Sequence, residues 1–254
     1  GNTCLAALRN LRRRKQEIQD YILSPQNDSK GCGGVMRVAP AGLFQASSIE
    51  KLDYEGAQMA AITHGHSLGY MPGAVLTHMI NRIVFPDPRD GESHEKRSLK
   101  EIILEARDMA RELFKDDMYL KKLTDAIDKA IELSENQEED LKNIHELGEG
   151  WVAEETLAIS LYCSLRYQND FSAGIIAAVN HKGDSDSTGA VTGNILGAWL
   201  GYEQIEDKWK KDLELLEIIL EIAGDISQGC RINEYSGPEE DPDWERKYIS
   251  CRWK

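Results

Sequence analysis

The sequence predicts an all-α protein, and three observations support that prediction. Apolar residues recur at three- and four-residue spacing along most of the 254 residues, as in amphipathic helices. The strict alternation typical of strands is weak, and the best strand candidate, 35–38, is short and flanked by glycine. Four glycines recur every four residues late in the chain, as on one face of a helix. Helices are expected over 2–20, 40–48, 53–63, 67–84, 98–114, 119–134, 153–168, 171–180, 187–202 and 207–226.

The length allows one large core without disulfides, so we expect a single domain over 1–254. Polar stretches at 85–98 and 134–143 interrupt the helical pattern and indicate surface loops or insertions. The region 86–148 is therefore expected to be a peripheral, insertion-like helical part of that domain. The tail 236–254 contains two prolines and is expected to be irregular, held by Trp244, Tyr248 and Trp253.

Composition excludes several classes of protein. A net charge of −14 disfavours nucleic acid and anionic lipid as partners. No apolar run reaches the roughly 18–20 residues that span a bilayer, and no signal peptide is visible, so a cytoplasmic location is expected. The five cysteines are odd in number and contain no C-x-x-C pair, which argues against a disulfide framework and a zinc site.

A short acidic turn separates two expected helices at 180–189. Asp184 and Asp186 alternate with a serine, so both carboxylates can face one point, and a hydroxyl follows at Ser187 or Thr188. Carboxylate and hydroxyl oxygens suit Mg²⁺, Mn²⁺ or Ca²⁺ better than zinc or copper. The alternative is that Asp186, Ser187 or Thr188 simply caps the next helix.

The glycine stripe follows this turn directly. Gly189, Gly193, Gly197 and Gly201 would each cost about 0.5–1 kcal/mol relative to alanine inside a helix. Close approach of another helix would explain that cost. We therefore expect a buried central helix with the acidic turn at its N-terminus.

A glycine-rich loop at 29–40 and a histidine segment at 63–70 complete the unusual features. Three glycines among four residues allow backbone N–H groups to approach a phosphate or ribose closely, although a plain flexible loop is the alternative. Arg37 is expected to be an ion-pair partner or a ligand contact. His64 is expected either to cap or pack, or to contact a ligand.

Together and in this order, the segments 1–4, 29–43, 63–70, 150–163 and 180–201 resemble the ADP-ribosylglycohydrolase family. The resemblance implies an orthogonal multi-helix bundle with two Mg²⁺ ions, Mn²⁺ being possible. It implies hydrolysis of the glycosidic bond between ADP-ribose and a modified protein side chain or small molecule, and thus an ADP-ribosylated protein or small conjugate as partner. The residues that it assigns to metal binding are Asp184, Asp186 and Ser187, and those that it assigns to ADP-ribose are Lys30, Gly31, Cys32, Gly33, Gly34 and His64.

The sequence departs from the family pattern in one respect. The family has an earlier acidic motif, Thr-Asp-Asp or Ser-Asp-Asp, upstream of the segment with which this chain begins, and the catalytic acid is expected there. The pair Asp116–Asp117 does not match that motif. We expect the chain to be a fragment lacking this N-terminal part. The alternatives are a second polypeptide that supplies the missing half-site, or a non-catalytic ADP-ribose-binding or structural member.

Overall fold

The computed structural model describes residues 1–14, 18–45, 48–85, 97–228 and 241–250. The secondary structure of these residues is helical, with no strand among them, which confirms the all-α class. A single antiparallel bridge, between Gly31 and Val152, is the β-type pairing that they contain. None of the described helices is both long and apolar enough to cross a membrane. The chain divides into two compact units, 1–211 and 212–254.

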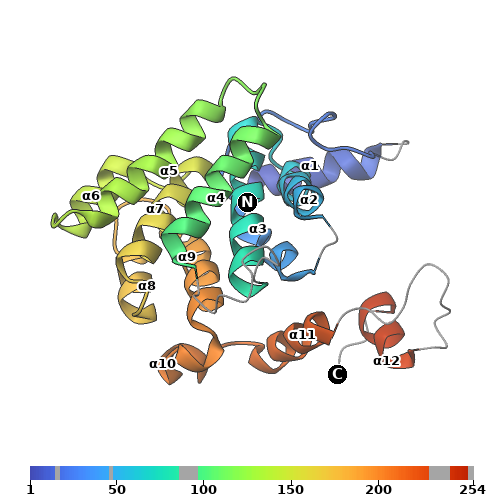
Figure 1. The fold of residues 1–254 in the computed structure, drawn as a ribbon. Helices are drawn as coiled ribbons and strands as arrows, with labels where there is room; N and C mark the ends of the chain where they lie inside the picture. The colour runs from blue at the N-terminus through green and yellow to red at the C-terminus, as the bar shows by residue number, and fades with distance from the viewer. Residues whose placement is uncertain (15–17, 46–47, 86–96, 229–240, 251–254) are drawn as a thin grey trace. The chain divides into compact units, whose positions relative to one another are not determined.

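The first unit is a bundle in which helices cross at varied angles (Figure 1). Its elements are α1 (Asn2–Arg13), η1 (Val35–Arg37), η2 (Ala39–Leu43), α2 (Ile49–Ala61), α3 (Ser67–Val84), α4 (Leu99–Leu113), α5 (Leu120–Glu135), α6 (Asp140–Leu147), α7 (Ala153–Arg166), α8 (Phe171–Val179), α9 (Ser185–Leu200), η4 (Tyr202–Gln204) and α10 (Asp207–Lys210).

Helix α3 is the central helix of this unit. It is apolar on nearly every side, and each residue from Leu68 to Asn81 is buried, as expected of a helix surrounded by others. Helices α2, α4, α5, α7 and α9 all pack against it. Its predicted bounds, 67–84, agree with the structure, and His66 caps its N-terminus by accepting a hydrogen bond from the Leu68 N–H at 3.0 Å.

Helix α9 is only partly buried, so the prediction of a buried central helix after the acidic turn is wrong. A Cβ at Gly189 would lie 2.7 Å from Val179 Cγ1 of α8, which is the expected close approach. At Gly193 and Gly197 the nearest atoms would lie at 3.6 and 4.0 Å, which is ordinary contact. Gly201 follows the helix and has a φ of +83°. Only the first glycine of the stripe is therefore required by helix packing.

Part of the region expected to be peripheral contributes to the core. Of 86–148, residues 86–96 lie outside the described residues. Helices α4 and α5 place Leu99, Ile103 and Leu123, among others, in the same apolar cluster as α3. Their inward faces are thus integral to the bundle. The expected bounds of one domain, 1–254, stay a prediction.

Helix α6 begins inside the stretch 134–143 that was expected to be a loop. Its residues Asn143, Ile144 and Leu147 form a buried face. Asp140 accepts a hydrogen bond from the Tyr162 hydroxyl of α7 at 2.6 Å. Tertiary contacts of this kind stabilise a helix whose sequence is too polar to predict one.

Two short segments adopt 3₁₀ turns instead of the predicted structure. The strand candidate 35–38 is η1, in which Val35 and Val38, three residues apart, are both buried. The helix expected over 40–48 is limited to η2, and residues 46–47 lie outside the described residues. The helix expected over 2–20 ends at Arg13, and residues 15–17 are likewise not described.

The second unit contains α11 (Leu216–Gln228), α12 (Pro242–Trp244) and the π-helical turn η6 (Glu245–Ile249). The helix predicted over 207–226 is therefore divided, and Leu215, just before α11, has a φ of +61°. Of the tail expected to be irregular, the described residues 241–250 form short helical turns. Within it the rings of Trp244 and Tyr248 lie 4.4 Å apart, and Lys247 pairs with Asp225 of α11. Trp253 lies outside the described residues.

Candidate active site

The acidic turn lies at the N-terminus of α9 and is held by the segment that precedes α7. The Asp184 N–H donates to the Glu149 carbonyl at 2.7 Å. A Cβ at Gly183 would lie only 1.8 Å from that same carbonyl oxygen. A side chain at position 183 would therefore push the turn off its support, which explains the glycine at this position.

Asp184 stands at the N-cap position of α9, but its side chain makes no capping hydrogen bond. Its Oδ2 instead accepts hydrogen bonds from the Ser187 hydroxyl and the Cys32 thiol, each at 2.9 Å. Asp186, the second carboxylate, is exposed. The helix begins at Ser185, so none of the three residues that the alternative named as caps stands at the N-cap position.

The two carboxylates influence each other's ionisation. Burial raises the pKa of Asp184, but its contact with Asp186 and the hydrogen bonds from Cys32 and Ser187 outweigh burial and lower that pKa below its ordinary value. Contact with the Asp184 carboxylate and its negative charge raise the pKa of Asp186. Within the described part of the chain, neither carboxylate forms an ion pair with a lysine, arginine or histidine. Their mutual repulsion is therefore open to relief by an added cation.

Cys32 connects the glycine-rich loop to the acidic turn, although 152 positions separate it from Asp184 in the sequence. Burial and the hydrogen bond to Asp184 raise the pKa of the thiol to about 11. Without a metal, the sulfur is then protonated at neutral pH, and Cys32 serves as a hydrogen-bond donor to the carboxylate.

The glycine-rich loop is pressed against the imidazole of His64. A Cβ at Gly31 would lie 3.3 Å from His64 Nε2, and one at Gly33 would lie 3.0 Å from His64 Cε1. The ring is buried, and its Nδ1 lies 2.8 Å from the Thr63 hydroxyl. Burial and the charge of Arg37 lower the pKa of His64 to about 4, so the ring is neutral at physiological pH. His64 thus packs beneath the loop, while Gly34 is buried against α2 and α3.

Lys30 and Arg37, at the two ends of this loop, have different partners. The Lys30 ammonium lies 3.3 Å from the buried carboxylate of Glu154, which Lys122 also contacts at 2.9 Å. Arg37 forms no ion pair among the described residues; its guanidinium donates to the carbonyls of Gly33 at 3.0 Å and Met59 at 2.7 Å. The predicted ligand contact stays a prediction. It therefore fixes the loop to the end of α2.

The structure brings Cys32 of the glycine loop into contact with Asp184 and Ser187, two of the predicted metal residues. Two backbone hydrogen bonds join that loop to the segment before α7: Cys32 N–H to the Trp151 carbonyl at 3.3 Å, and Ala153 N–H to the Lys30 carbonyl at 2.9 Å.

The sequence analysis did not identify three residues that contact the site: Glu149, Glu154 and His181. The histidine directly before the acidic turn was the available signal for the last of these.

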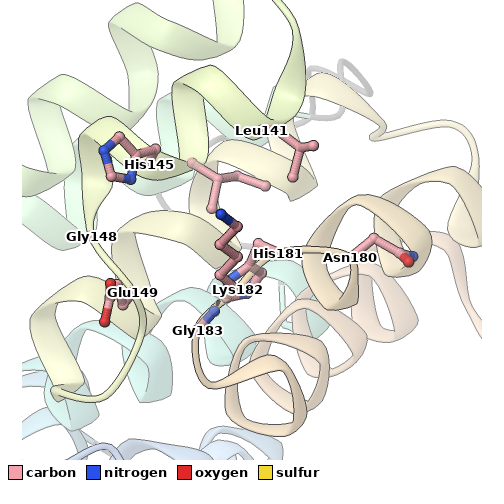
Figure 2. Close-up of a pocket in the computed structure, with 9 residues that line it drawn as sticks. Leu141, His145, Gly148, Glu149, Asn180, His181, Lys182 and Gly183 are labelled. Carbon is pink, nitrogen blue, oxygen red and sulfur yellow. Dashed lines mark hydrogen bonds between the residues drawn. The ribbon is translucent and has the colours of Figure 1, made fainter.

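A pocket of about 590 Å³ lies on the other side of the turn (Figure 2). It is formed by α6, the start of the segment before α7 and the residues that lead into the acidic turn. Its lining residues are Leu141, Ile144, His145, Gly148, Glu149, Asn180, His181, Lys182 and Gly183.

The donors of the acidic turn fit a hard divalent cation in part. Among the described residues, no group of three or more histidine, cysteine, aspartate or glutamate side chains could hold a metal ion. The turn does provide three oxygen-bearing groups: two carboxylates and the Ser187 hydroxyl. Mg²⁺ commonly binds through one or two carboxylates and keeps several waters, so this set matches part of its coordination shell.

Comparison with known proteins gives one consistent result. Residues 1–235 match the model of the family described as ADP-ribosylglycohydrolase. The chain is 29% identical to the ADP-ribosylhydrolase ARH3 of Homo sapiens over 209 residues, which cover 73% of this chain and 54% of that protein. An uncharacterised protein of Archaeoglobus fulgidus is 27% identical, over 77% of this chain and 57% of its own length. The chain thus spans about half the length of the curated relatives that it matches.

Proposed function

We propose a function from the premise that this chain belongs to the ADP-ribosylglycohydrolase family, as its match over residues 1–235 shows. The proposed function is Mg²⁺-dependent hydrolysis of the bond between ADP-ribose and a modified protein side chain or small molecule. The single observation that carries it is the meeting of the acidic turn with the glycine-rich loop, through Asp184 and Cys32 at 2.9 Å. A cation on the turn would lie beside a loop whose backbone can approach a ligand closely.

The roles of the residues follow from their contacts. Asp184 and Asp186 would hold the cation, with Ser187 as a further oxygen donor, because their charges have no cationic partner in the described part of the chain. Gly31 and Gly33 would approach the ADP-ribose with their backbone, since they carry no side chains and the Cys32 thiol between them is turned to Asp184. Gly34 is buried against α2 and α3 and would support the loop from within. His64 would set the position of the loop from below, with its ring against Gly31 and Gly33.

A bound divalent cation would supply Lewis acidity, polarising the ribose hydroxyls and lowering the pKa of a water molecule near the anomeric carbon. The chain's own residues would bind and orient the substrate. Cys32 and Ser187 keep Asp184 ionised by donating hydrogen bonds to it, which preserves a charged cation ligand at neutral pH. Among the described residues, none near the turn is placed to be assigned as the general base.

One observation favours a second candidate function, ADP-ribose binding without hydrolysis. The acidic turn supplies two carboxylates and one hydroxyl, and the described residues contain no group of three or more acids, histidines or cysteines that could hold a metal ion. A chain with this partial set could hold ADP-ribose on the glycine loop and leave the glycosidic bond intact. Binding and turnover must therefore be measured separately.

The test is titration of ADP-ribose into the chain with and without Mg²⁺, followed by incubation with arginine-, serine- and ester-linked ADP-ribose conjugates. We expect binding that depends on Mg²⁺ and is lost in Asp184→Asn. Asp116→Asn is the matched control, since Asp116 is an exposed acid outside the site. Binding without release of ADP-ribose would favour the second candidate. Binding that is equally strong without Mg²⁺ and in Asp184→Asn would exclude the metal-dependent function.

A further inference from the structure

The imidazole of His181 spans the acidic turn from one end to the other. Its Nδ1 accepts a hydrogen bond from the Gly183 N–H at 3.0 Å, and its Nε2 lies 2.9 Å from the Thr188 hydroxyl. The predicted metal residues all lie in the chain between these two anchor points. One ring therefore fixes the distance between the beginning of the turn and the first turn of α9.

The two contacts also define the state of the ring. Nδ1 is an acceptor, because the Gly183 N–H can only donate. The Thr188 hydroxyl donates its proton to the Ala178 carbonyl at 2.6 Å, so it must accept from Nε2–H. This assignment follows from the hydrogen-bond partners and makes His181 a neutral imidazole with one fixed orientation.

Backbone contacts hold the rest of the turn. Glu149 receives the Asp184 N–H and touches Gly183, and the Ser185 hydroxyl donates to the His181 carbonyl at 3.3 Å. Figure 2 shows His181 and Glu149 together on the wall of the pocket beside the turn. His181 is half-buried there, so the ring supports the turn from the pocket side.

We propose that His181 is a positioning residue, whose imidazole holds residues 183–188 in the shape that lets Asp184 and Asp186 face one cation. The proposal rests on the proposed function for the identity of the metal. The shape of the turn, however, is measurable in the metal-free protein. Groups that orient metal ligands through a hydrogen bond typically contribute 10–100-fold to metal affinity.

An asparagine at position 181 could also accept the hydrogen bond from the Gly183 N–H, because asparagine side chains bond the backbone N–H two residues later in turns. His181→Asn therefore keeps an acceptor for Gly183, whereas His181→Ala removes both contacts of the ring. His145→Ala is the matched control. His145 lines the same pocket, is exposed, and makes no side-chain hydrogen bond among the described residues.

The experiment measures two quantities on each full-length variant: amide hydrogen exchange of Gly183 without metal, and Mg²⁺ affinity by titration calorimetry. For His181→Ala we expect exchange at Gly183 to be about tenfold faster or more, and Mg²⁺ binding to be about 10–100-fold weaker. His181→Asn should recover the slow exchange at Gly183, but its Mg²⁺ binding should stay weaker than that of the wild type, because asparagine restores only one of the two contacts. His145→Ala should match the wild type. If His181→Ala fails to fold, wild-type Mg²⁺ affinity in His181→Asn would overturn the proposal.

Two results would overturn the proposal: unchanged Gly183 exchange in His181→Ala, or normal Mg²⁺ affinity in a variant whose turn is loosened. Failure of the proposed function looks different. If the wild type binds no Mg²⁺, the metal site itself is refuted. The exchange data then decide the role of His181 alone: faster exchange restored by asparagine supports it, and no change refutes it.

Discussion

Two groups of acidic residues in the described part of the chain differ in how their negative charge is compensated. In the acidic turn, Asp184 and Asp186 have no cationic side chain as partner among the described residues. In the second place, formed by α2, α3 and α4, the buried Asp53 lies 2.9 Å from His78. Glu105 there contacts His78 at 3.5 Å and Arg82 at 3.0 Å. We call this second group the His78 network.

The contrast separates a structural cluster from a candidate binding site. Buried charges are tolerated when opposite charges compensate them, as in the His78 network, where three helices are tied together. Carboxylates that repel each other without such compensation cost stability, and a cation from solution is the simplest compensation. Acidic residues thus tie the fold together where cationic side chains lie beside them, and they form a candidate cation site where none does.

The largest expected effect is on the His78 network. His78→Ala leaves Asp53 buried without its partner, and removing one member of a buried ion pair typically costs about 3–5 kcal/mol. We expect chemical denaturation to show a loss of that size, with unchanged Mg²⁺ affinity. A loss below about 1 kcal/mol would mean that Asp53 and His78 do not stabilise the bundle. The contrast between the His78 network and the acidic turn would then not hold.

The next effect is on the acidic turn. Asp184→Asn should weaken Mg²⁺ binding by at least about 100-fold, because even supporting groups of a metal site contribute up to that amount. The melting temperature without metal should fall only slightly, because the asparagine oxygen can still accept the hydrogen bonds of Cys32 and Ser187. A marked loss of stability in the metal-free variant would instead place Asp184 among structural residues.

The two regions should also differ in their response to pH. His78 lies beside two acids that raise its pKa above the ordinary value of 6.5, even though burial lowers it. Its contribution to stability is therefore fully present below 6.5 and is lost as pH rises through the raised value. Denaturation measured at a series of pH values from below 6.5 upward should show this loss in the wild type and not in His78→Gln.

In the acidic turn, the expected loss occurs as the pH falls, and it affects Mg²⁺ binding. The Asp184 carboxylate raises the pKa of Asp186 above 3.8, so Mg²⁺ binding should weaken as pH falls through that raised value. Calorimetric titration at several acidic pH values measures the change. Mg²⁺ affinity that is constant down to 3.8 would show that Asp186 is not a ligand.

The smallest effect concerns the helix that carries the turn. Gly197→Ala would place its Cβ 4.0 Å from the nearest atom, so it should stabilise the protein by up to about 1 kcal/mol. Gly189→Ala would place a Cβ 2.7 Å from Val179, next to the turn, and should lower both stability and Mg²⁺ affinity. Equal effects of the two substitutions, compared by thermal denaturation, would show that α8 does not support the turn.

Several elements were predictable because their signals are local. The bounds of α3 follow from a continuous apolar pattern after His66, and those of α4 lie within a residue of the prediction, with Ser98 and Glu101 forming a capping box. The acidic turn was also recognisable, since a glycine followed by alternating acids specifies its chemistry without reference to the rest of the chain.

By contrast, α6 and the short η1 could not be predicted from their own residues. Asp140 and Asn143 of α6 gain their partners from Tyr162 of a later helix. Val35 and Val38 form a 3₁₀ turn because both side chains must enter the core three residues apart. In each case contacts with distant residues outweigh weak local preference.

The sequence by itself determined the helical class, the position of α3 and the residues of the acidic turn, because periodicity and turn chemistry depend on near neighbours in the chain. Only the tertiary structure decided that Cys32 donates to Asp184, that His64 lies beneath the glycine loop, and that the Asp53 charge is compensated while the acidic turn's is not. These relations join residues far apart in sequence, and packing of the helices around α3 sets the distances between them.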